Sequence, residues 1–136
     1  MTDLELMRLA EDARAYSYTP YSHFAVGAAL LTKSGKVYTG CNIENASYTP
    51  TVCAERTAVF KAVSEGEREF AAIAIIGGSA GQKGRFCAPC GVCRQVLREF
   101  CALDFRILLG TTEEVQTFTL GDLLPTSFAP SDLKGE

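Results

Sequence analysis

The apolar run FAAIAIIG, residues 70–77, limits the folds available to this chain more than any other stretch. A strand with one face in water alternates apolar and polar side chains, but this run contains no polar residue. Continuous apolar strands are typical of the centre of a sheet whose two faces are both covered. The run therefore predicts an α/β protein with helices packed on the faces of one sheet.

The predicted elements on either side of this run alternate between helix and strand. Gly35 lies in a short turn that joins the first two strands as a hairpin. Because helices connect the later strands, we expect right-handed crossovers and parallel central strands. The 136 residues fit one domain, 1–136, whose polar tail after about residue 130 we expect to be loose. The apolar patterns predict helices over 3–16, 53–65 and 90–101, and further strands over 24–32, 37–43, 105–110 and 115–120.

The composition argues against several classes of partner. Net charge is −3 and there is no basic run, so we expect no nucleic acid polymer and no membrane as partner, whereas a small molecule fits. The longest apolar run is too short to cross a bilayer, and the N-terminal residues lack the apolar core of a signal peptide. Six cysteines without such a signal favour a cytoplasmic protein, in which thiols bind metal or react more often than they form disulfides.

Two short cysteine motifs stand at predicted helix starts. The chain has one histidine, so a metal site in it must use thiolates or carboxylates. The motifs are CAE at 53–55 and PCGVC at 89–93. Both helices are expected to begin at the same end of the sheet, which would bring Cys53, Cys90 and Cys93 around one point. Three thiolates and an open fourth position are typical of a catalytic zinc, whereas structural zinc is closed by four protein ligands.

The neighbouring charges fit such a site. Helix N-termini lower thiol pKa values and stabilise anionic ligands. Three thiolates around Zn²⁺ leave one excess negative charge, so a cation is expected nearby, and Arg56 and Arg94 each lie next to a motif. Glu55 follows Cys53 by two residues, from where its carboxylate could take a proton from water and pass it to a leaving group.

Other interpretations of the cysteines remain open at this point. Thiols at helix starts are often buried small apolar groups, and Cys90 with Cys93 could form a redox pair. Cys87 could act as a fourth ligand and close a non-catalytic zinc module. However, C-x-E followed by P-C-x-x-C is the known signature of zinc deaminases, with cysteine in place of the first histidine. Pro89 marks the helix entry, so we expect Cys87 in the preceding loop, outside the ligand set.

The stretches CAERTA, PCGVCRQV and GCNIENASY together resemble the cytidine deaminases, of the small homotetrameric kind with three zinc-binding cysteines. The resemblance runs from about residue 4 to residue 133. It implies a three-layer α/β/α sandwich with a mixed five-stranded sheet and one zinc ion per subunit. It also implies hydrolytic deamination of cytidine and 2′-deoxycytidine to the uridines with release of ammonia, a step of pyrimidine salvage.

The resemblance further implies a role for each matching residue. Sites would lie at subunit interfaces of the homotetramer, with Tyr48 near the site and Phe128 reaching into that of a neighbouring subunit. The family commonly has serine where this chain has Ala88, but the implied role belongs to a main-chain carbonyl, which alanine supplies equally. The implied roles are zinc binding by Cys53, Cys90 and Cys93, proton transfer by Glu55, donation to ligand sulfurs by Arg56, binding of the ribose 3′-hydroxyl by Asn42 and Glu44, and pyrimidine contact by Phe24 and the main chains of Ala54 and Ala88.

A deaminase of another aminopyrimidine nucleoside, such as blasticidin S, is the alternative within the same fold. The NIEN stretch at 42–45 favours an unmodified ribose instead. Among the remaining candidates, His23 is expected at the surface or an interface, and Cys41 and Cys101 are expected to be packed thiols. Arg94 would either balance the charge of the site or cap its helix turn.

Overall fold

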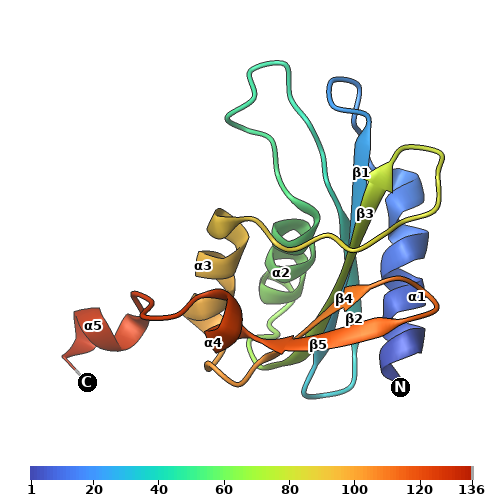
Figure 1. Ribbon diagram of the computed structural model, residues 1–136. Coiled ribbons are helices and arrows are strands. Elements are labelled where there is room, and N and C mark those ends of the chain that lie inside the picture. The colour runs from blue at the N-terminus through green and yellow to red at the C-terminus, as the bar shows by residue number, and fades with distance from the viewer. Residues whose placement is uncertain (136) are drawn as a thin grey trace.

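The computed structural model describes residues 1–135. Its five-stranded sheet has the order β2-β1-β3-β4-β5, and helices cover both faces (Figure 1). The fold is thus the expected three-layer α/β/α sandwich around a mixed sheet. The elements are α1 Asp3–Ala13, the 3₁₀ helix Arg14–Tyr16, β1 Phe24–Thr32, β2 Val37–Cys41, α2 Ala54–Ser64, β3 Phe70–Ser79, α3 Gly91–Phe100, β4 Arg106–Gly110, β5 Val115–Thr119, α4 Leu120–Leu123 and α5 Pro130–Lys134.

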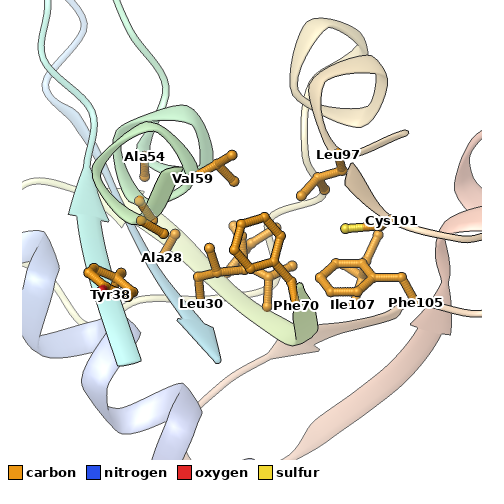
Figure 2. Packing of buried hydrophobic residues seen from close by; sticks show 14 of the residues in the cluster. Ala28, Leu30, Tyr38, Ala54, Val59, Phe70, Leu97, Cys101, Phe105 and Ile107 are labelled. Atoms are coloured by element: carbon orange, nitrogen blue, oxygen red, sulfur yellow. The ribbon is translucent and has the colours of Figure 1, made fainter. Parts of the chain in front are cut away.

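The central strand β3 is buried on both faces, as its continuous apolar sequence predicts. Ile73 and Ile75 belong to the core beneath α2 and α3, together with Leu30, Val59 and other residues. Figure 2 shows Leu30 and Val59 in this core. Residues on the other face of β3, including Ile76, pack against α1. Each of these three isoleucines is fully buried. Two separate cores, one on each face, therefore hold the helices to the sheet.

The expectation of parallel central strands is only partly correct. β3 and β4 are parallel, but β1 runs antiparallel to both of its neighbours, β2 and β3. The reason is that the chain leaves β2 through α2 and returns as β3 on the far side of β1. The crossover therefore joins two strands of the same direction, and the hairpin strand β1 lies between them.

The two chain ends differ in how they are held. Thr2 caps α1 through a reciprocal capping box with Glu5. Where we expected a loose tail after residue 130, Pro130–Lys134 forms α5, which lies apart from the sheet in Figure 1. Within residues 1–135, none of the helices has the length and apolar character needed to cross a membrane.

Candidate metal centre and active site

Three cysteine sulfurs meet where α2 and α3 begin. Cys53 and Cys90 are the N-cap residues of these helices, and neither thiol caps its own helix. The Sγ of Cys90 lies 3.6 Å from that of Cys53 and 3.4 Å from that of Cys93. All three sulfurs lie within 4.8 Å of one another. Zn–S bonds of about 2.3 Å in a tetrahedral site separate the sulfurs by about 3.8 Å, so the cluster fits a zinc ion.

Cys87 is not part of this cluster of metal-ligand candidates. Its thiol is half-buried in the loop before α3 and points toward the carbonyl of Ala88, with Sγ and O 3.9 Å apart. Three protein sulfurs therefore converge, and a fourth from Cys87 does not join them. This arrangement favours the open site over the closed structural one.

Arg56 supplies the positive charge beside the sulfurs. Its Nη2 donates to Cys53 Sγ at 3.4 Å, and its buried Nε has no hydrogen-bond partner in the protein. Hydrogen bonds from the Cys93 thiol and from Arg56 lower the pKa of Cys53 to about 5, despite the opposing effect of burial. A thiolate next to a cation is the form in which cysteine binds metal.

Arg94, the other candidate cation, has a structural role. Its Nε donates to the carbonyl of Pro89 at 2.8 Å, and its Nη1 donates to that of Leu123 at 2.7 Å. It therefore ties the start of α3 to the end of α4. Of the two roles left open for Arg94, this is the capping one.

Glu55 lies in the first turn of α2, next to the sulfur cluster. Its side chain is almost fully buried, at 4% exposure. Burial raises the pKa of Glu55 to about 7, with a further contribution from the negative charge of Cys53. A carboxyl group that titrates near neutrality can both accept and donate a proton at physiological pH, which is what general acid–base catalysis requires.

Glu44 lies at the edge of a cavity of about 400 Å³ that is lined by Tyr21, Ser22, Glu44, Tyr48 and Thr51. The main-chain N–H groups of Tyr21 and Ser22 donate to Glu44 Oε1 at 3.0 and 3.1 Å, and the Ser22 hydroxyl donates to Oε2. These bonds, that of the Ser22 hydroxyl first, lower the pKa of Glu44. The carboxylate is thus held ionised, as an acceptor suited to a sugar hydroxyl.

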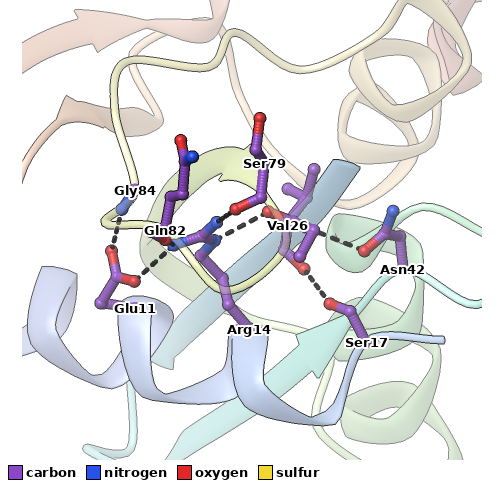
Figure 3. A network of polar contacts seen from close by, with 9 residues as sticks. Glu11, Arg14, Ser17, Val26, Asn42, Ser79, Gln82 and Gly84 are labelled. Atoms are coloured by element: carbon purple, nitrogen blue, oxygen red, sulfur yellow. Dashed lines mark hydrogen bonds and ion pairs between the residues drawn. The ribbon is translucent and has the colours of Figure 1, made fainter. Parts of the chain in front are cut away.

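Asn42 uses both ends of its amide to hold β1. Its Oδ1 accepts from Val26 N at 2.9 Å (Figure 3), and its Nδ2 donates to Phe24 O at 2.8 Å. The amide retains one free N–H and one further lone pair. Asn42 therefore fixes the backbone of Phe24, the predicted pyrimidine contact, and keeps hydrogen-bonding capacity for a ligand.

The aromatic residues implied at subunit interfaces are exposed in the single chain. Tyr48 is 71% exposed and meets Tyr21 edge-on, with ring centroids 6.1 Å apart. Phe128 is 58% exposed and lies between α4 and α5. Both rings thus have the exposure that contact with another chain would require.

The remaining predicted residues occupy ordinary positions. Ala54 is fully buried as the first residue of α2, and Ala88 is exposed just before Pro89. His23 is exposed, as expected for a surface histidine. Cys101 is buried in the core at the end of α3, and Cys41 is half-buried. Both agree with packed thiols.

Sequence reasoning missed the residues that orient this site through the backbone. Two of the three hydrogen bonds that Tyr21 and Ser22 donate to Glu44 come from main-chain N–H groups, which leave no signal in the sequence. The turn residues TPYS at 19–22, followed twenty residues later by NIEN, were the available clue.

Comparison with known proteins gives one consistent result. A family model described as "Cytidine and deoxycytidylate deaminase zinc-binding region" matches residues 1–108. The cytidine deaminase of Halalkalibacterium halodurans is 49% identical over 129 residues, which cover 94% of this chain and 95% of that protein. That of Sporosarcina psychrophila is 45% identical over 130 residues, covering 95% of this chain and 93% of that one. The crystal structure of cytidine deaminase from Burkholderia pseudomallei superposes with a TM-score of 0.85, at 48% identity, over 94% of this chain and 100% of that chain.

Proposed function

Because the chain belongs to the cytidine deaminase family, we propose that it hydrolyses cytidine and 2′-deoxycytidine to uridine and 2′-deoxyuridine with release of ammonia. The observation that carries this proposal is the buried Glu55, whose pKa is raised to about 7 beside three converging sulfurs. A carboxyl group of this kind suits a reaction that moves protons at neutral pH.

Cys53, Cys90 and Cys93 would hold the zinc ion, and the sulfur spacing and the contact from Arg56 support this assignment. Zinc with three protein ligands and one open position lowers the pKa of water and so provides a nucleophile at neutral pH. Arg56 offsets the excess negative charge of three thiolates, which would otherwise weaken this effect. Its unpaired Nε lies in the same buried region.

Glu55 would carry the protons of the reaction. It takes one from the attacking water and delivers it to N3 of cytosine, so that the ring can accept the water at C4. It then takes the proton of the hydroxyl group now on C4 and passes it to the amino group, so that the C4 carbonyl forms as the C4–N bond breaks and ammonia leaves. Its burial supports this role, because a carboxyl group with a pKa near 7 gives and takes protons with little cost.

The other polar groups would bind and orient the nucleoside. Asn42 and Glu44 would hold the ribose 3′-hydroxyl, Phe24 would pack on the base, and the main chains of Ala54 and Ala88 would contact its polar edge. The ionised Glu44 and the spare hydrogen-bonding capacity of Asn42 support this arrangement. Binding energy from the ribose would position C4 for attack.

We further propose that the chain acts in the cytoplasm as a homotetramer with sites at its subunit interfaces. The high exposure of Tyr48 and Phe128 supports a homotetramer with sites at its interfaces, because a neighbouring chain would cover each ring. The six free cysteines of the described residues suit a reducing compartment.

A comparison of the wild type with Glu55→Gln tests the proposed function. The wild type should lower the ultraviolet absorbance of cytidine and release one ammonia per uridine, and it should turn over blasticidin S poorly. Glu55→Gln should keep its zinc, because glutamine preserves the packing, and should lose about 10²–10⁴-fold in kcat. Normal turnover in the variant would contradict the assigned role of Glu55, and no turnover of cytidine by the wild type would contradict the function.

A further inference from the structure

A positively charged side chain lies over the ring that is proposed to contact the base. The guanidinium carbon of Arg85 is 5.6 Å from the centroid of the Phe24 ring, within the range of a cation–π contact. Arg85 is exposed and belongs to the glycine-rich loop between β3 and α3, 61 residues from Phe24 in sequence. The contact therefore joins the loop that leads to Cys90 with the strand that carries the base-contacting ring.

The edge of the Phe24 ring packs closely against Gly77 of β3. A Cβ built on Gly77 would lie 2.9 Å from Cys87 Sγ and 3.1 Å from Phe24 Cε2. The ring edge and the Cys87 thiol thus share the space that a side chain at position 77 would fill. Arg85 thus lies over one face of the ring, and Gly77 lies at its edge.

Both main-chain polar groups of Arg85 form hydrogen bonds with Gly77 of β3. Its N–H donates to Gly77 O at 2.7 Å, and its carbonyl accepts from Gly77 N at 3.2 Å. One residue earlier, the Gly84 N–H donates to Glu11 Oε2 at 3.1 Å. Arg85 is therefore anchored both to β3 and, through Gly84, to α1.

Arg14 completes this anchoring and extends it to β1. Its buried guanidinium donates to Ser79 O at 3.1 Å, at the end of β3, and to Gln82 O at 2.9 Å in the loop (Figure 3). It also donates to Ala25 O at 2.7 Å, next to Phe24. One buried side chain thus sets the loop with Arg85 and the strand with Phe24 relative to each other.

We infer that Arg85 is a positioning residue that fixes the ring of Phe24 for packing against the pyrimidine. The inference rests on the proposed function, in which Phe24 contacts the base. Arg85 acts on binding and leaves the proton transfers of Glu55 unchanged, because its contact is with the ring. An exposed cation–π contact is worth about a two- to fivefold change in an equilibrium, so this is the expected effect on nucleoside affinity.

The test is a double-mutant cycle of Arg85→Met and Phe24→Leu, with Arg85→Lys as the conservative variant. Arg85→Met should raise the KM for cytidine about two- to fivefold with kcat nearly unchanged, and Arg85→Lys should restore most of the affinity. Phe24→Leu should raise KM more, and in its presence Arg85→Met should have no further effect. Calorimetric binding of cytidine to the same variants carrying Glu55→Gln would show that KM reports affinity.

Lys83→Met is the matched control for loss of one positive charge. Lys83 is exposed on the same loop and pairs with Glu113, away from the ring contact, so its loss should leave KM unchanged.

An equal rise in KM for Lys83→Met, or additive effects of Arg85→Met and Phe24→Leu, would overturn the inference while the proposed function stands. A fall in KM for Arg85→Met would also overturn it, because the guanidinium would then occupy the face that the base needs. An unchanged KM for Phe24→Leu would contradict both the inference and the proposed base contact, whereas absence of deamination by the wild type would contradict the function itself.

Discussion

At the scale of single residues, the three cysteines of CAPCGVC have different surroundings. Cys90 and Cys93 lie at the start of α3 with their sulfurs 3.4 Å apart, whereas Cys87 lies in the loop against Gly77. Burial raises the pKa of the Cys87 thiol, and its sulfur is not among the three that converge. Nearness in sequence thus does not place this thiol in the cluster.

We predict that Cys87→Ser retains one zinc ion per subunit and activity within about threefold of the wild type, because its thiol is not a ligand. Cys93→Ser should lose both, since one of only three protein ligands is removed from a buried position. Metal analysis by mass spectrometry and the cytidine assay check the two variants side by side. Loss of zinc from Cys87→Ser alone would mean that the site is closed by four sulfurs.

The cysteines and Glu55 could be predicted from the sequence, because their chemistry depends on residue type and spacing. Arg14 and Arg85 could not. Arg14 donates mainly to main-chain carbonyls, which every residue possesses, so no pairing pattern marks it in the sequence. Arg85 contacts a ring 61 residues away, and only the fold brings the two together.

At the scale of elements, the position of the site depends on how closely α2 approaches β2. A Cβ built on Gly40 of β2 would lie 2.4 Å from Ala54 O and 2.6 Å from Ala58 N, both in the backbone of α2. Such contacts require the helix to move, since backbone atoms cannot rotate away. The first turn of this helix carries Glu55, and its N-cap is Cys53.

We therefore predict that Gly40→Ala lowers both zinc content and kcat, by about tenfold or more in kcat, because a shift of about 1 Å in a catalytic group is costly. Gly91→Ala is the control. Gly91 follows Cys90 directly, but a Cβ there meets no atom within 4 Å. Alanine at this first residue of α3 should leave zinc content and kcat unchanged. Equal behaviour of the two variants in the zinc and cytidine assays would contradict the role of this close approach.

The elements themselves were predictable where apolar periodicity is strong, and their pairing was less so. The apolar run of β3 correctly indicated burial on both faces. The sequence did not predict that β1, rather than β2, lies next to β3 as its antiparallel neighbour, because local sequence does not say on which side of a hairpin a crossover returns. The helix α5 was also missed, since it consists of five residues without an apolar stripe.

At the scale of the whole molecule, the proposed homotetramer would complete each site with residues of a neighbouring chain. Glu55 and the sulfurs are inside one chain, whereas Phe128 extends from the α4–α5 connection with 58% of its surface exposed. If the ring closes the site of a neighbouring subunit, each site draws essential residues from two chains. In a closed symmetric assembly the same interface repeats, so every site would be completed in the same way.

Subunit mixing tests this arrangement. Glu55→Gln should be nearly inactive, and Phe128→Ala should bind cytidine weakly because an aromatic wall of the site is lost. When equal amounts of the two variants are unfolded and refolded together, about one quarter of the sites should combine an intact Glu55 with an intact Phe128 from the other chain. Activity should therefore rise to about one quarter of that of the wild type, while each variant refolded alone should show no gain.

Light scattering on the same samples should give four chains per particle. No recovery in a tetrameric mixture would mean that Phe128 does not act across the interface, and a monomeric wild type with full activity would contradict the shared site.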